Sequence, residues 1–226
     1  MRNKISNTSK VIAALALTLT LTTTIASAQS AYPPPSALAA QWWRWAESAP
    51  ASVNPVADQT GQFAAVNQPK GNLWFLAGNF GGTTERTITI PAGKALFFPI
   101  QNIVDVEDGI ETPGGSKVFL IKQPLRTAQG LVSYVISTAY GMSCSVDANN
   151  IPITAANLEL SNPFSLQLPT DNVFGYPAGV YYPAVDSGYY VLLNPLSPGQ
   201  HTIHFAGCTA FFNNFCLDVT YHLTVQ

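Results

Sequence analysis

Charged residues are scarce in this chain of 226 residues, where Asp, Glu, Lys and Arg together make up 10%, against about 25% in an average soluble protein. The 10 Lys and Arg residues are too few to build the basic stripe that holds nucleic acid, so we exclude a nucleic-acid partner. Disorder of the whole chain is excluded because hydrophobic residues reach 47%. The chain also lacks internal repeats and Gly/Ser-rich linkers, which favours one domain.

Long apolar runs are absent except near the N-terminus. Three basic residues precede an apolar, Thr-rich run at 11–25, and the small residues 26–28 follow it. This order is typical of a secretory signal peptide, whereas a membrane anchor needs about 20 apolar residues. We therefore predict a signal peptide over residues 1–28 and a single domain over residues 29–226. The protein would be secreted, extracellular or periplasmic, and not membrane-spanning after removal of the signal.

Cysteine is rare as well, with three residues in the chain. Cys208 and Cys216 bracket a short segment between two strand-like runs, so we predict a disulfide between them, which an exported protein can keep. Cys144 is then left over, either buried or paired between chains, and a bridge from Cys144 to one of the others is the alternative. A cysteine metal site would need closer ligand spacing.

A first helix is predicted from Ala37 to Ser48. The spacing of three residues places Trp42 and Trp45 on one face and turns Trp43 away by about 100°. The interpretation we favour is that this helix closes one end of a β core with two tryptophans. An aromatic platform for a ligand is the alternative.

A second helix is predicted over residues 124–140, where apolar residues recur at steps of three and one. Pro124 suits the first turn of a helix, and Gly141 suits the position after its end. Because β-branched residues are frequent here, a strand over residues 131–137 is the alternative.

Short strand-like runs separated by Gly and Pro fill the rest of the chain. They predict a mostly β fold, an antiparallel β-sandwich or jelly roll, with a short N-terminal helix and one additional helix. The run Arg86–Ile90 alternates, which predicts a half-buried strand of an antiparallel sheet. Asn149 and Asn150 are predicted to form a hairpin turn. The predicted strands span residues 72–77, 84–90, 94–100, 144–147, 151–153, 157–160, 165–168, 189–193, 200–207 and 216–225.

The last two predicted strands place all three histidines of the chain in one hairpin. If Cys208 stands opposite Cys216, His204 lies diagonal to both Asp218 and His222 on one face. Two imidazoles and a carboxylate on one face suit a transition-metal ion. The alternative, which we favour, is an ordinary solvated sheet face. The opposite face is predicted to face the core with His201, Ile203, Phe205, Val219, Tyr221 and Leu223.

An acidic cluster offers a second candidate metal site. Asp105, Glu107, Asp108 and Glu111 lie within seven positions, and Ca²⁺ prefers carboxylate oxygens in irregular geometry. The sequence does not match an EF-hand loop, and a solvated acidic loop is the alternative. The cofactors predicted are thus at most Ca²⁺ or a transition metal.

Aromatic residues suggest where a ligand binds. We predict Trp43, Tyr176, Tyr181 and Tyr182 as ligand-binding residues, since aromatic rings with a polar handle on a β scaffold suit sugar faces. The function predicted is a secreted, non-catalytic binding or surface-associated module, with an extracellular glycan or cell-surface component as partner. An extracellular hydrolase or lyase acting on a polymer is the first alternative, and a structural self-associating surface protein is the second. The sequence leaves enzymatic activity and oligomeric state open.

Overall fold

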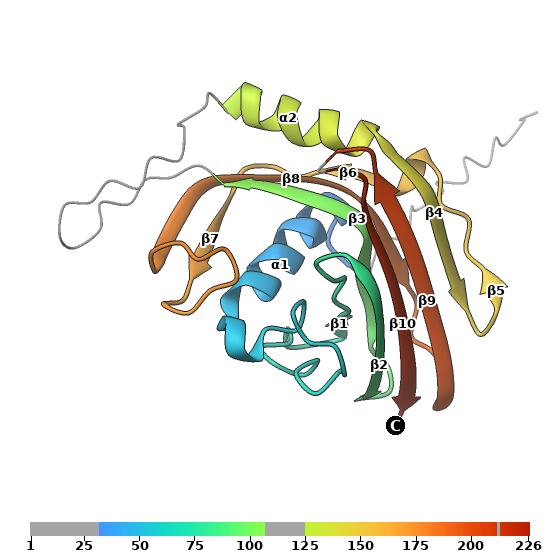
Figure 1. Ribbon diagram of the computed structural model, residues 1–226. Coiled ribbons are helices and arrows are strands. Elements are labelled where there is room, and N and C mark those ends of the chain that lie inside the picture. The colour runs from blue at the N-terminus through green and yellow to red at the C-terminus, as the bar shows by residue number, and fades with distance from the viewer. Residues whose placement is uncertain (1–31, 107–124, 212) are drawn as a thin grey trace, which may run out of the picture. The chain divides into compact units, whose positions relative to one another are not determined.

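The computed structural model describes residues 32–106, 125–211 and 213–226. The described helices and strands all belong to the unit Pro33–Gln226. Strands outweigh helices there, and two sheets are present with two α-helices. The predicted mostly β, sandwich-like fold with two helices is therefore confirmed (Figure 1).

Two five-stranded sheets form the scaffold. Sheet A contains β1 (Leu73–Phe75), β3 (Ala95–Val106), β8 (Gly179–Leu193), β6 (Leu158–Leu160) and β7 (Phe164–Leu168), with β6 and β7 both paired to β8. Sheet B contains β2 (Gly82–Ile90), β10 (Phe215–Val225), β9 (Gly199–Thr209), β4 (Ala139–Val146) and β5 (Asn149–Asn150), in that order. Two 3₁₀ helices, η1 (Ala51–Val53) and η2 (Ala155–Asn157), complete the described elements.

Both sheets are mixed, because β1 pairs with β3 and β2 pairs with β10 in parallel. The antiparallel pairing predicted for Arg86–Ile90 is therefore wrong, although its alternation is right: Ile88 and Ile90 are buried, and Thr87 and Thr89 are exposed. The reason lies in the short turn after Ile90. It carries the chain from sheet B into sheet A instead of closing a hairpin, so β2 takes its neighbour from the C-terminal strand.

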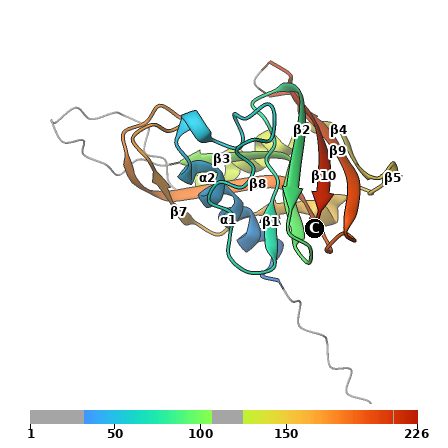
Figure 2. The same cartoon turned by 90° about the horizontal axis from the view of Figure 1, so that it is seen from below.

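The helices lie on opposite faces of sheet A (Figures 1 and 2). Helix α1 (Pro35–Ser48) packs against β7, β8 and β3, and its Trp42 and Trp45 are buried, as predicted. They cover a sheet face rather than one end of a β core. Helix α2 (Leu125–Ser137) packs against β3 and β8 and confirms the second predicted helix over the alternative strand.

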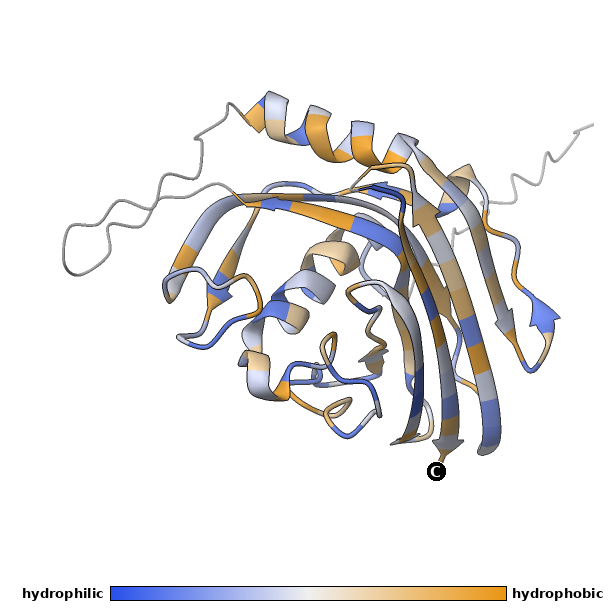
Figure 3. Cartoon of the chain, viewed as in Figure 1, coloured by the Kyte–Doolittle hydropathy of each residue, from blue (hydrophilic) through white to orange (hydrophobic). Residues whose placement is uncertain are grey.

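The main core lies between the two sheets. The register Cys216↔Cys208 matches the prediction, and alternation along β9 and β10 points every second side chain inward (Figure 3). The predicted core-facing residues of this hairpin are buried except His201, which is half-buried. The inward set from sheet B includes Ile88, Ile90, Ile203, Phe205, Leu217, Val219, Tyr221, Leu223 and Val225.

Strand β3 packs against different elements along its length, although it pairs with β8 on both sides of its bulge. Phe98, before a bulge between Pro99 and Gln101, and Ile100, within it, pack against sheet B; after the bulge, Ile103 packs against α2. The two sheets lie close together here, since a Cβ on Gly207 would lie 3.1 Å from the Ile100 carbonyl oxygen. Beyond this crossing the sheets diverge, and α2 covers the part of sheet A that sheet B leaves open.

The predicted hairpin turn at Asn149-Asn150 is displaced. Those residues form β5, and the turn is made by Asp147 and Ala148, both with positive φ angles (50° and 65°). Asp147 is held there because its carboxylate accepts hydrogen bonds from β9. The strand predicted over residues 151–153 is not formed.

Candidate functional site

A polar groove of about 230 Å³ opens on sheet B beside the start of β9, lined by Asp147, Gln200, His201, Thr202 and His222. The β4–β5 turn supplies Asp147, the first residues of β9 supply three side chains, and β10 supplies His222. The Asp147 carboxylate fastens the turn to β9: Oδ1 accepts from the Thr202 backbone N–H at 2.8 Å, and Oδ2 lies 2.7 Å from His201 Nδ1.

His201 has a hydrogen-bond acceptor at each ring nitrogen. Nδ1 faces Asp147 Oδ2, and Nε2 lies 2.8 Å from the Ser197 carbonyl oxygen. These acceptors, Asp147 first, raise the pKa of His201, while the hydrogen bond from His201 lowers the pKa of Asp147. Because both ring nitrogens of His201 face acceptors, neither presents a free lone pair to a substrate, so the residue anchors the turn and is not placed as a general base.

The three predicted transition-metal ligands form two separate pairs. His204 Nε2 lies 3.0 Å from Asp218 Oδ1, as the diagonal register requires, but His222 Nε2 lies 2.5 Å from Glu85 Oε1 on β2. In the described part of the chain, no group of three or more His, Cys, Asp or Glu side chains is arranged to hold a metal ion. The metal site at His204, Asp218 and His222 stays a prediction, which elemental analysis of the purified protein would test.

Of the four predicted calcium ligands, Glu107, Asp108 and Glu111 lie outside the described residues. Asp105 ends β3, and its Oδ2 is buried without a hydrogen-bond partner among the described residues. Burial raises the pKa of this carboxyl. The calcium site also stays a prediction.

The predicted aromatic ligand residues separate into two locations. Trp43, Tyr176 and Tyr181 join one hydrophobic cluster where β7, β8 and α1 meet, and Tyr182 is 59% exposed. Tyr176 and Tyr181 have ring centroids 6.0 Å apart. Tyr181 is buried and its hydroxyl donates to the Pro177 carbonyl oxygen at 2.8 Å. This cluster is thus packed as part of the core, and the ligand role of its members stays a prediction.

Asp186 is a fully buried carboxylate beneath α1 that we did not predict from the sequence. Its Oδ1 accepts from Trp43 Nε1 at 2.6 Å and from the Tyr190 hydroxyl at 2.7 Å. Asn102 donates in turn to the Tyr190 oxygen at 3.0 Å. Burial raises the pKa of Asp186 to about 7, in spite of these two donors. The signal in the sequence is a lone carboxylate within an apolar strand.

Arg86, on the inward face of β2, is a second buried charged residue that we did not identify from the sequence. Its five N–H groups donate five hydrogen bonds, one to the Tyr221 hydroxyl and the others to backbone carbonyl oxygens. The acceptors belong to Val56, Asp58, Ala77 and Gly78. The period-2 pattern of β2 placed Arg86 inward, and that alternation was the available signal.

The disulfide Cys208–Cys216 is present, as predicted, and Cys144 is a free thiol buried in the main core. Burial raises the pKa of Cys144 to about 12. A thiol of that kind is inert as a nucleophile, because the thiolate is the reactive form. No helix in the described ranges is long and apolar enough to cross a membrane.

Comparisons of the chain with protein-family models, with curated proteins and with solved structures found no match. The function is therefore argued from the geometry of the sites.

Proposed function

We propose that this protein is a secreted, non-catalytic binding module that holds a glycan in the groove beside Asp147 and His222. The observation that carries the proposal is the groove itself, a polar surface depression that five side chains line. Export through a signal peptide over residues 1–28 is part of the proposal. The disulfide Cys208–Cys216 supports it, because such bonds persist in oxidising compartments.

The chemistry of the groove suits sugar hydroxyl groups, each of which both donates and accepts hydrogen bonds. Asp147 offers carboxylate oxygens, 43% of its side chain being exposed, and His222 offers an imidazole that is 42% exposed. Gln200 Nε2 donates to Thr224 Oγ1 at 2.9 Å, which orients the amide and leaves its oxygen as an acceptor for a ligand. The groove thus supplies both donors and acceptors from neighbouring strands of sheet B.

The arrangement supports binding over hydrolysis or lyase chemistry. A general base must present a free lone pair to the substrate proton. His201 has an acceptor at each ring nitrogen, so it presents no free lone pair to a substrate. Asp186, whose pKa is raised to about 7 by burial, is fully buried and cannot contact a polymer.

A glycan array with the purified protein, followed by calorimetry on each hit, tests the proposal. Gln200→Ala and His222→Ala should each weaken binding by about tenfold, since each removes a hydrogen-bonding group from the groove. His204→Ala is the matched control: it removes a histidine paired with a carboxylate on the same sheet face, outside the groove. It should leave the affinity unchanged.

Two outcomes would contradict the proposal. The first is an array without a saturable ligand, and the second is an equal loss of affinity in His204→Ala and His222→Ala. Self-association without glycan binding, measured by light scattering, would favour the structural alternative. Release of shorter products from a bound polymer would favour the enzyme.

A further inference from the structure

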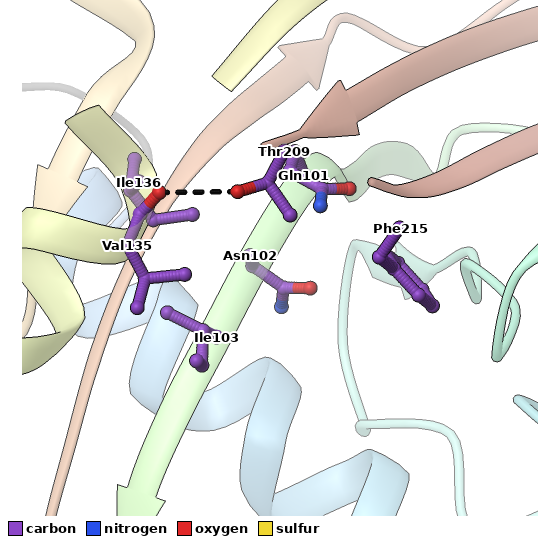
Figure 4. Close-up of a pocket in the computed structure, with 7 residues that line it drawn as sticks. All are labelled: Gln101, Asn102, Ile103, Val135, Ile136, Thr209 and Phe215. Carbon is purple, nitrogen blue, oxygen red and sulfur yellow. Dashed lines mark hydrogen bonds between the residues drawn. The ribbon is translucent and has the colours of Figure 1, made fainter. Parts of the chain in front are cut away.

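A cavity of about 140 Å³ lies where the two sheets diverge, away from the groove. Its walls come from β3, the C-terminal end of α2 and the end of the β9–β10 hairpin (Figure 4). Four apolar side chains and three polar ones line it: Ile103, Val135, Ile136 and Phe215, with Gln101, Asn102 and Thr209. None of these seven carries a formal charge.

The bulge in β3 explains why the space exists. It changes the direction of the strand between Pro99 and Gln101, so sheet B no longer covers sheet A beyond this point. The C-terminal end of α2 covers one side of this space with Val135 and Ile136. Thr209 and Phe215 are directly paired across β9 and β10, one position beyond the Cys208–Cys216 pair, so the disulfide braces this wall.

One polar atom in the cavity wall has no hydrogen-bond partner in the part of the chain that the structure describes. Gln101 is 2% exposed, and its Oε1 is buried without a hydrogen-bond partner among the described residues. Figure 4 shows the Gln101 amide between Thr209 and Phe215, at the edge of the space. A buried amide oxygen without a hydrogen-bond partner costs free energy, so each instance requires a physical explanation.

The other two polar residues already have hydrogen-bond partners. The Thr209 hydroxyl donates to the Val135 carbonyl oxygen at 3.2 Å and lies 2.7 Å from Thr138 Oγ1. Asn102 Nδ2 donates to the Tyr190 hydroxyl. Gln101 Oε1 is therefore the polar atom of the lining that is left to form a hydrogen bond with a bound molecule.

We propose that this cavity binds a small, neutral aromatic molecule that carries one hydrogen-bonding group, of the size of phenol. An engineered protein cavity of about 150 Å³ with apolar walls binds benzene, so the volume is right for one six-membered ring. The apolar walls and the Phe215 ring pack against the ring of the guest. Gln101 Oε1 accepts a hydrogen bond from the hydroxyl group of the guest, and the absence of charge in the lining disfavours ions.

The test uses phenol and benzene as probes, titrated into the oxidised full-length protein and followed by NMR. Wild type should bind phenol saturably and about tenfold more tightly than benzene, because phenol alone satisfies the buried amide. The methyl signals of Val135 and Ile136 should shift. Gln101→Met keeps the length of the side chain without the amide, so it should bind the two probes equally.

Further variants separate the cavity from the groove and from misfolding. His222→Ala lies outside the cavity and should bind phenol as wild type does. Val135→Phe should fill the cavity and abolish binding of both probes. If either cavity variant fails to fold, the methyl shifts of the wild type decide alone.

The proposal is overturned if phenol does not saturate in wild type, if the shifts fall on methyl groups outside the cavity, or if phenol and benzene bind equally. It is also overturned if a folded Gln101→Met variant keeps the preference for phenol. Ordered water alone in the cavity, with no displacement by phenol, would show that solvent satisfies Gln101.

Discussion

Arg86 and Asp186 are both buried charged residues, and their surroundings satisfy them to different degrees. Arg86 donates all five of its N–H groups. Asp186 accepts two hydrogen bonds on Oδ1, while its Oδ2 is buried with no partner among the described residues. The first site is a filled hydrogen-bond network around a permanent charge, and the second is a half-filled one around a group that can take up a proton.

The difference follows from the backbone around each residue. The carbonyl groups that surround Arg86 belong to Val56, Asp58, Ala77 and Gly78, all of them outside strands and free to turn toward it. Asp186 lies in the middle of β8, where β3 on one side and Ser161 on the other use the nearby backbone groups. Side chains alone must satisfy it, and Trp43 and Tyr190 reach one oxygen only.

We expect the largest effect from Arg86→Met. The substitution leaves four buried carbonyl groups and the Tyr221 hydroxyl without this donor, and such losses in a buried charged network cost about 3–5 kcal/mol. Chemical denaturation would measure this as a lower midpoint.

Arg44→Met is the matched control for that prediction. Arg44 is exposed and donates from Nε to the Ser165 carbonyl oxygen, with its guanidinium over the Phe164 ring. Exposed interactions of this kind contribute about 0–1 kcal/mol. A loss below about 1 kcal/mol for Arg86→Met, equal to that of the control, would show that Arg86 does not anchor the loops.

Much of the fold could be predicted from the sequence because it depends on local patterns. The alternation in β9 and β10, the cysteine spacing and the tryptophan spacing in α1 predicted register, disulfide and buried face correctly. The parallel pairing of β2 with β10 could not be predicted in this way. It depends on the sheet into which the chain passes after Ile90, and a short turn allows either outcome.

The candidate sites were less predictable for the same reason. Asp147 and His201 are 54 positions apart in the chain, and no local pattern links them. The diagonal contact of His204 with Asp218 followed from register, but the partner of His222 came from β2, whose placement the sequence did not indicate. The cavity arises from a bulge in β3, and its buried amide is visible only once the sheets are packed.

A second prediction concerns the pH dependence that Asp186 creates. Burial raises its pKa in the folded state to about 7, against about 3.9 in the unfolded chain. Between these values the folded state binds more protons than the unfolded state, so the free energy of unfolding falls as the pH rises from about 4 to about 7. The slope is at most about 1.4 kcal/mol per pH unit. Asp186→Asn should flatten it, as urea denaturation at a series of pH values would show.

Glu47 provides the comparison for Asp186→Asn. It is buried in α1, with Oε2 unpartnered among the described residues, and burial raises its pKa to about 8. Glu47→Gln should therefore flatten the same profile up to a higher pH than Asp186→Asn does. An Asp186→Asn profile identical to that of wild type would mean that Asp186 is ionised in the folded state across this range.

The smallest effect, and the sharpest contrast, comes from removing one hydroxyl at each site. The Tyr221 hydroxyl accepts from Arg86 Nη1 at 2.7 Å, and the Tyr190 hydroxyl donates to Asp186. Tyr221→Phe should cost about 1.5–3 kcal/mol, as for hydrogen bonds to charged groups. That cost should be the same at pH 5 and pH 8, because the guanidinium is charged at both.

Tyr190→Phe should instead have a cost that depends on pH. Without the Tyr190 donor the carboxylate form of Asp186 is less stable, so the pKa of Asp186 rises further. The loss should be about 1.5–3 kcal/mol at pH 8, where the carboxylate would carry its charge, and about 1 kcal/mol or less at pH 5, where Asp186 is protonated in the folded state. Denaturation of both variants at the two pH values measures the contrast. Equal losses at pH 5 and pH 8 for Tyr190→Phe would remove the distinction between the two sites.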